Sequence, residues 1–86
     1  MSILVTGGSG LVGSSVARLL AEGGENVILY DIVERRDSYF AGLEDKLTFE
    51  EGNIQDFPRI SQVVRDNTDL TGIVHTVALL GGDVRD

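Results

Sequence analysis

A glycine-rich run, Thr6 to Gly13 (TGGSGLVG), lies between a short apolar segment and a helix-like pattern near the start of the chain. The segment before it, Ile3 to Val5, is apolar and rich in β-branched residues, as in a buried strand of a parallel sheet. After it, apolar residues recur at helical spacing, at Val12, Val16, Leu19 and Leu20. The sequence therefore predicts a strand, a glycine loop and a helix in direct succession.

This succession is typical of a site for a nucleotide pyrophosphate. Gly7 or Gly8 allows a tight turn, Gly10 lets the backbone approach the phosphates, and Gly13 lets the helix pack closely on the strand. The first amides of the helix lack partners and its dipole is positive there, so an anion is stabilised. A glycine-rich turn that binds nothing accounts less well for the flanking strand and helix. No Lys-Ser or Lys-Thr pair opens the helix, which disfavours a P-loop.

The composition restricts the classes of partner. The chain has 86 residues and a net charge of −7, from 14 acidic and 7 basic residues, which argues against nucleic acid and anionic membranes. It has no cysteine, and its single histidine has no companion ligands nearby, so we expect no metal site. No apolar run approaches a membrane span, and Met1-Ser2 leads straight into the first strand. We therefore expect a soluble, cytoplasmic protein.

A second apolar run, Asn26 to Tyr30, follows the Gly-Gly pair at which the first helix should end. Asp31 stands at its end, where parallel sheets bind their ligands. It lies about two dozen residues after the first glycines, close to the spacing of the acid that binds the adenosine ribose. Such a carboxylate repels a 2′-phosphate, which favours NAD over NADP. Arg35 and Arg36 keep NADP open as the alternative cofactor, and a turn-opening aspartate is the alternative role of Asp31.

The rest of the chain predicts two more strands and one more helix. Residues 33–46 show no strong helix pattern, and Leu47 to Glu51 alternates as in a strand near a sheet edge. Asp56 is a suitable N-cap for a helix that ends near Asn67. The apolar stripe of this helix is formed by Ile60, Val63 and Val64. Gly72 to Val77 is the expected fourth strand, which gives an α/β chain.

The run TGGSGLVG resembles the T-G-x-x-G-x-x-G motif of the extended short-chain dehydrogenase/reductases, the NAD-dependent epimerase/dehydratase family. The resemblance extends over all 86 residues, as the opening part of a longer pattern. It implies a Rossmann-type, doubly wound parallel sheet, partial here with about four strands in the order 3-2-1-4. It also implies that residues 1–86 are the N-terminal part of one NAD(P)-binding domain, whose C-terminal catalytic and substrate-binding part is absent. We expect the full-length protein to be a homodimer.

Two later stretches extend the resemblance. Gly52 to Asp56 (GNIQD) is similar to the G-D-hydrophobic-x-D stretch that contacts the adenine in the family. Asn53 replaces the usual aspartate and Ile54 would supply an apolar wall, although a turn and a core residue are the alternative roles. His75 to Ala78 (HTVA) resembles the H-x-A-A stretch that passes the phosphates and ribose, with Val77 in place of the first alanine.

The motifs and the resemblance together predict one set of cofactor-binding residues. The set is Gly7, Gly8, Ser9, Gly10, Leu11, Val12, Gly13, Asp31, Ile32, Asn53, Ile54, Thr76, Val77 and Ala78. His75 lies on an apolar strand with no acid or nucleophile beside it, so we expect a core residue rather than a catalytic one.

The chemistry of the family rests on a Ser or Thr and a Tyr-x-x-x-Lys pair farther along the chain. Tyr30 and Tyr39 are followed four residues later by Glu34 and Leu43, and the one lysine is Lys46 in the variable segment. We therefore expect no catalytic residue here and no activity of the chain alone. The first functional hypothesis is the cofactor-binding portion of an NAD-dependent epimerase, dehydratase or dehydrogenase. Its substrate would be a nucleotide sugar or a similar alcohol, bound only by the full-length protein.

The second hypothesis is a non-catalytic NAD(P)-binding regulatory or sensor module. A bare α/β domain with an unused glycine loop is the third. The residues that would touch a substrate are not among those present, so the substrate cannot be derived from this sequence.

Overall fold

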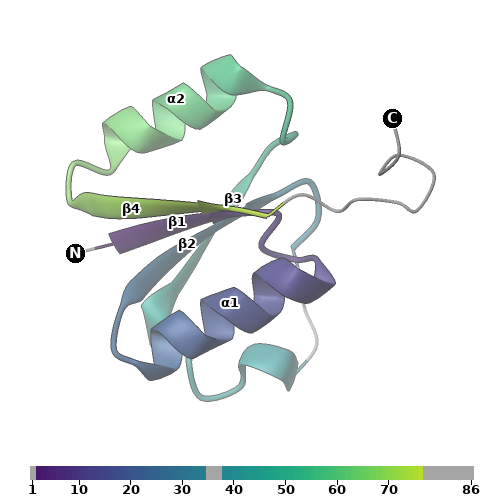
Figure 1. The fold of residues 1–86 in the computed structure, drawn as a ribbon, viewed down its shortest axis with the longest axis vertical. Helices are drawn as coiled ribbons and strands as arrows, with labels where there is room; N and C mark the ends of the chain where they lie inside the picture. The colour runs from purple at the N-terminus through teal and green to yellow at the C-terminus, as the bar shows by residue number, and fades with distance from the viewer. Residues whose placement is uncertain (1, 35–37, 77–86) are drawn as a thin grey trace.

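A computed structural model describes residues 2–34 and 38–76 of the chain. The main elements are β1 (Ser2–Thr6), α1 (Leu11–Glu22), β2 (Asn26–Asp31), β3 (Leu47–Glu51), α2 (Phe57–Asp66) and β4 (Leu70–His75). Two single turns of 3₁₀-helix, Ser38–Phe40 and Glu44–Lys46, lie in the segment between β2 and β3 for which no helix was predicted. Figure 1 shows the sheet between α1 and α2.

The four strands form one parallel sheet in the order β3-β2-β1-β4. This confirms the predicted α/β fold and the predicted order. The register pairs Thr6 at the end of β1 with Tyr30 on β2 and with His75 on β4. The carboxyl ends of the strands therefore lie along one edge of the sheet, which is the edge where such sheets bind ligands.

The two helices cover opposite faces of the sheet (Figure 1). Because alternate residues of each strand point to opposite sides, each helix packs on a different set of strand residues. On the face covered by α1, one apolar cluster is formed by Val5, Ala17, Ala21, Val27, Leu29 and Phe40. On the face covered by α2, a second cluster is formed by Leu4, Ile28, Tyr30 and Val63. Both faces of the central strands are thus buried, as their continuous apolar sequence predicts.

The face of α1 that contacts the sheet coincides only in part with the apolar residues at helical spacing. The buried residues of this helix are small, namely Gly13, Ser14, Ala17 and Ala21. Val12 and Leu19 of the predicted stripe are 65% and 69% exposed, and Val16 and Leu20 are half-buried. Leu20 packs against the first cluster, whereas Val12 and Leu19 do not contact the core among the described residues. The closest approach is made by small side chains, because they let the helix backbone come near the strands.

Two element boundaries and one burial assignment can also be compared with the predictions from the sequence. Asp56 caps α2 as predicted, since its carboxylate accepts a hydrogen bond from the Arg59 amide at 3.1 Å. The strand β4 begins two residues before the predicted Gly72. His75 is exposed in the described part of the chain, so its assignment to the core was wrong. Neither helix among the described residues is both long and apolar enough to cross a membrane.

Candidate functional site

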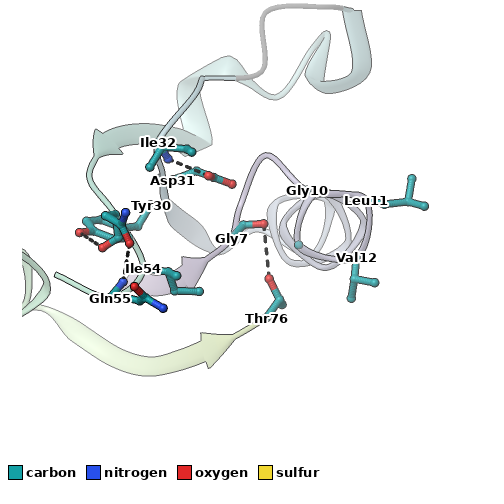
Figure 2. Close-up of a pocket in the computed structure, with 12 residues that line it drawn as sticks. Gly7, Gly10, Leu11, Val12, Tyr30, Asp31, Ile32, Ile54, Gln55 and Thr76 are labelled. Carbon is teal, nitrogen blue, oxygen red and sulfur yellow. Dashed lines mark hydrogen bonds between the residues drawn. The ribbon is translucent and has the colours of Figure 1, made fainter. Parts of the chain in front are cut away.

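A pocket of about 680 Å³ opens at the carboxyl ends of the strands. This volume lies within the range of about 300–1,000 Å³ that is usual for small-molecule sites. It is lined by Gly7, Gly10, Leu11, Val12, Gly13, Tyr30, Asp31, Ile32, Asn53, Ile54, Gln55 and Thr76. In Figure 2, Asp31 and Ile32 lie on one side of the glycine loop and Thr76 on the other. All four strands therefore contribute residues at or just beyond their ends.

The glycine loop is built by close backbone contacts. Gly7 has a φ of +71°, which favours glycine, and its amide donates a hydrogen bond to Tyr30 O at 2.8 Å. A Cβ on Gly13 would lie 2.0 Å from Gly7 O, so only glycine fits where the helix touches the loop. A Cβ on Gly8 would lie 2.9 Å from the Leu29 side chain. The fold itself therefore requires glycine at positions 8 and 13, because the added Cβ atoms would meet other residues of the protein.

Gly10 differs from these glycines. A Cβ added there would meet only Gly7 O, at 3.3 Å, and its backbone is extended, with φ −75° and ψ 173°. The fold itself therefore demands little of this position. Gly10 is the N-cap of α1 and lines the pocket, and its lack of a side chain leaves room for a ligand at the helix start.

The start of α1 suits an anionic ligand. Within residues 2–34 and 38–76, no side chain makes a capping hydrogen bond there, and the first turn contains no acidic residue. The unpartnered amides and the positive end of the helix dipole thus face a pocket that is bordered by glycine. This is the arrangement in which a phosphate group is bound at a helix N-terminus.

Asp31 lies at the end of β2 with both carboxylate oxygens engaged by backbone amides. Its Oδ2 atom accepts a hydrogen bond from the Ser9 amide at 3.0 Å, and its Oδ1 atom accepts one from the Ile32 amide at 2.7 Å. The Ser9 hydroxyl also donates to Val33 O. These bonds orient the carboxylate, and each oxygen retains acceptor capacity for hydroxyl groups of a ligand.

The segment after β3 forms a second wall. Asn53 Oδ1 accepts a hydrogen bond from the Gln55 amide at 2.8 Å, which closes a local turn. Asn53 O accepts a hydrogen bond from the Tyr30 hydroxyl at 2.8 Å. Ile54 is half-buried and lines the pocket, where it offers an apolar surface.

Thr76 ties the end of β4 to the glycine loop. Its hydroxyl donates to Thr6 O at 2.6 Å and lies 3.4 Å from Gly7 O. His75 does not line the pocket, and its Nδ1 atom lies 2.7 Å from the Thr6 hydroxyl. The described residues contain no group of three or more His, Cys, Asp or Glu that could hold a metal ion.

The structure brings most of the predicted site residues together. Those that line the pocket are Gly7, Gly10, Leu11, Val12, Gly13, Asp31, Ile32, Asn53, Ile54 and Thr76. Gly8 and Ser9 are not among the lining residues, and the Ser9 amide contacts the pocket through its hydrogen bond to Asp31 Oδ2. Val77 and Ala78 lie outside the described residues. Binding by these residues stays a prediction.

Two residues that line the pocket, Tyr30 and Gln55, were not predicted. Tyr30 directly precedes Asp31 in the second strand and places a polar hydroxyl in an otherwise apolar run, which is a signal that could have identified it. Gln55 follows Ile54 in the same turn and carries no comparable signal.

Comparison with known proteins shows which sequence family and which solved folds this chain resembles. Residues 3–86 match the sequence model of the NAD dependent epimerase/dehydratase family. The chain is 34% identical over 79 residues to a UDP-glucose 4-epimerase from Streptococcus mutans, a match that covers 91% of this chain and 23% of that protein. The chain thus spans about a quarter of the length of this relative.

Two solved structures show similar folds with a bound dinucleotide. The enzyme WbmH from Bordetella bronchiseptica, in complex with NAD⁺, superimposes with a TM-score of 0.72 at 32% identity, over 93% of this chain and 27% of that one. The dTDP-glucose 4,6-dehydratase from Bacillus anthracis, in complex with NAD, has a TM-score of 0.74 at 26% identity, over 92% of this chain and 27% of that one.

Proposed function

The chain belongs to the NAD-dependent epimerase/dehydratase family, and from this premise we propose that it is the NAD-binding portion of an enzyme acting on a nucleotide sugar or a similar alcohol. The observation that carries the proposal is the meeting of the glycine loop, the start of α1 and Asp31 around one pocket. NAD, when bound, would accept a hydride from the substrate alcohol. The residues of this chain would bind and orient the NAD.

The pocket residues fit the parts of a dinucleotide. The space above Gly10 and the start of α1 suits the pyrophosphate, because a side chain is missing there and amides are available. Asp31, already oriented by two amides, suits the hydroxyls of the adenosine ribose. Ile54 and Asn53 then suit the adenine, as an apolar surface and a polar edge. NAD is preferred to NADP because the Asp31 carboxylate would repel a 2′-phosphate.

The relatives support nucleotide sugars as the substrate class. A UDP-glucose 4-epimerase and a dTDP-glucose 4,6-dehydratase are both among the proteins that this chain resembles. Because epimerases and dehydratases appear together, the reaction of the full-length protein is proposed only as hydride transfer to NAD from a sugar alcohol. A homodimer stays a prediction, to be checked by the mass of the full-length protein in solution.

A non-catalytic NAD-binding sensor module is the second candidate. The observation in its favour is that the 86 residues contain no Tyr-x-x-x-Lys pair. The reading frame after Asp86 separates the two candidates, since a Tyr-x-x-x-Lys pair there supports the enzyme. If that pair is missing from the full-length protein, the sensor is favoured.

Isothermal titration calorimetry with NAD and NADP tests the proposal directly. We expect NAD to bind at least about tenfold more tightly than NADP, a difference of about 1.4 kcal/mol. The variant Gly10→Ala should retain the fold and lose NAD affinity. Tighter binding of NADP, or unchanged NAD binding by Gly10→Ala, would contradict the proposed placement of the cofactor.

A further inference from the structure

Tyr30 is a fully buried residue that nevertheless borders the pocket. Its relative exposure is 0%, and its ring packs among Leu4, Ile28 and Val63 on the face covered by α2. A buried hydroxyl needs a hydrogen-bond partner, and the Tyr30 hydroxyl donates to Asn53 O at 2.8 Å. Figure 2 shows Tyr30 near Ile54 and Gln55, which follow Asn53 in the turn after β3.

Gly52 lies directly against the same phenol group, and its lack of a side chain permits this close contact. A Cβ on Gly52 would be 2.2 Å from the Tyr30 hydroxyl oxygen and 2.5 Å from Cζ. The Gly52 amide donates to Asp31 O at 2.9 Å. The segment that follows β3 is therefore bonded to the end of β2 at two successive residues. The Gly52 amide donates to the main chain of Asp31, and Asn53 O accepts from the Tyr30 phenol.

The surroundings keep the phenol in its donor form. Burial raises the pKa of Tyr30 above its ordinary value, the Asp56 carboxylate raises it further, and Arg59 lowers it in part. The neutral hydroxyl therefore persists through the physiological pH range, where it can donate its hydrogen bond to Asn53 O.

We propose that Tyr30 is a positioning residue. Its hydroxyl fixes the turn of Asn53, Ile54 and Gln55 in the position in which this turn forms one wall of the pocket. This inference rests on the proposed function, which places the adenosine half of NAD against that wall. The main-chain O of Tyr30 accepts hydrogen bonds from the Gly7 and Gly8 amides, and loss of the hydroxyl leaves these bonds in place. Among the described residues the hydroxyl itself is bonded to Asn53 O, so it acts on the adenosine half and leaves the phosphate position at the glycine loop unchanged.

The variant Tyr30→Phe removes the hydroxyl and keeps the ring, and Tyr39→Phe is its matched control. Tyr39 is the other tyrosine of the chain, does not line the pocket, and has its hydroxyl 3.3 Å from Ser15 Oγ. The ligands are ADP-ribose, which contains the adenosine half, and nicotinamide mononucleotide, which lacks it. Dissociation constants are measured on the intact protein by calorimetry and by NMR titration.

For Tyr30→Phe we expect the Kd of ADP-ribose to rise about fivefold to tenfold, the effect of one hydrogen bond, and that of nicotinamide mononucleotide to change less than about twofold. Tyr39→Phe should leave both constants within about twofold of the parent. An equal loss for both ligands, or an unchanged Kd for ADP-ribose, overturns the inference while leaving the proposed function intact. Failure of the parent protein to bind ADP-ribose refutes the proposed function, and this inference with it.

Amide hydrogen exchange gives a readout that does not depend on affinity. In Tyr30→Phe, the Gln55 amide should exchange faster while the amides of α1 keep the parent rate, because only the turn loses a bond. The variant Gly52→Ala should weaken ADP-ribose binding in the same selective way, since the added Cβ displaces the peptide from the phenol. Unchanged exchange at Gln55 would show that the hydroxyl does not hold the turn.

Discussion

The Ser9 amide donates a hydrogen bond to Asp31 Oδ2 at 3.0 Å, which joins the glycine loop to the end of β2 through the carboxylate proposed to bind ribose. The second oxygen of Asp31 accepts from the Ile32 amide at 2.7 Å. The carboxylate is therefore oriented before any ligand arrives, so binding does not have to restrict its rotation. The proposed phosphate position and the proposed ribose position are thus linked through a single side chain.

The first prediction concerns the charge of Asp31. In Asp31→Asn the shape is kept, but the negative charge and one acceptor oxygen are lost. We expect NAD affinity to fall about tenfold, or about 1.4 kcal/mol, and the preference for NAD over NADP to shrink. Calorimetry with both dinucleotides measures the change. Asp45→Asn, an exposed position outside the pocket, is the control for net charge, and an equal effect there would argue against a specific role for Asp31.

The second prediction separates two glycines of the same motif. Gly13→Ala should destabilise the protein by about 3 kcal/mol or more, because its Cβ would lie 2.0 Å from Gly7 O and the backbone must move. Gly10→Ala should cost less than about 1 kcal/mol, since its Cβ meets only Gly7 O at 3.3 Å. Urea unfolding followed by circular dichroism compares them. Equal destabilisation by both variants would show that Gly10 is constrained by the fold itself.

The third prediction concerns two adjacent serines of α1. The Ser14 hydroxyl is buried and donates to Gly8 O at 2.9 Å, whereas the exposed Ser15 hydroxyl donates to Leu11 O within the helix. Ser14→Ala leaves the Gly8 carbonyl without this donor and should lower the free energy of unfolding by about 1–2 kcal/mol. Ser15→Ala should stay within about 0.5 kcal/mol of the parent. A Ser14→Ala variant as stable as the parent would indicate that another donor reaches Gly8 O.

The fourth prediction is a pH dependence that arises from Tyr30. Its pKa is raised above 10.0 in the folded protein, so the folded state holds this proton more tightly than the unfolded state does. The stabilisation is complete below the unfolded value of 10.0 and is lost as the pH rises through the folded pKa. Urea unfolding between neutral pH and pH values above 10 should therefore show declining stability. Tyr30→Phe should remove this part of the decline, and an unchanged decline would assign it to other groups.

Much of the fold could be predicted from local patterns. The run from Thr6 to Gly13 specified a turn between a strand and a helix, and Asp56 specified the start of α2. These features depend on residues close in sequence, whose backbone preferences and caps act whatever the rest of the chain does. The positions of Gly10 and Asp31 beside one pocket then followed from the parallel order of the strands.

Contacts between segments that are distant in the sequence could not be predicted from local patterns. The apolar residues at helical spacing in α1 identified Leu20 as a core contact but not the small residues that lie closest to the sheet, Gly13, Ala17 and Ala21. Hydropathy increases with the size of an apolar group, whereas the helix approaches most closely where side chains are smallest. His75 was assigned to the core from an apolar strand pattern, yet it lies exposed on β4, which has no neighbour on its other side among the described strands.

The sequence by itself therefore determined the order of elements, the glycine loop and the acid at the end of β2, because each is set by a few neighbouring residues. Only the tertiary structure decided that Tyr30 reaches across to Asn53 O and that Ser9 meets Asp31. These bonds join residues 22 and 23 positions apart. Their existence depends on the distance between β2, β3 and the start of α1, and that distance is fixed only when both apolar clusters pack.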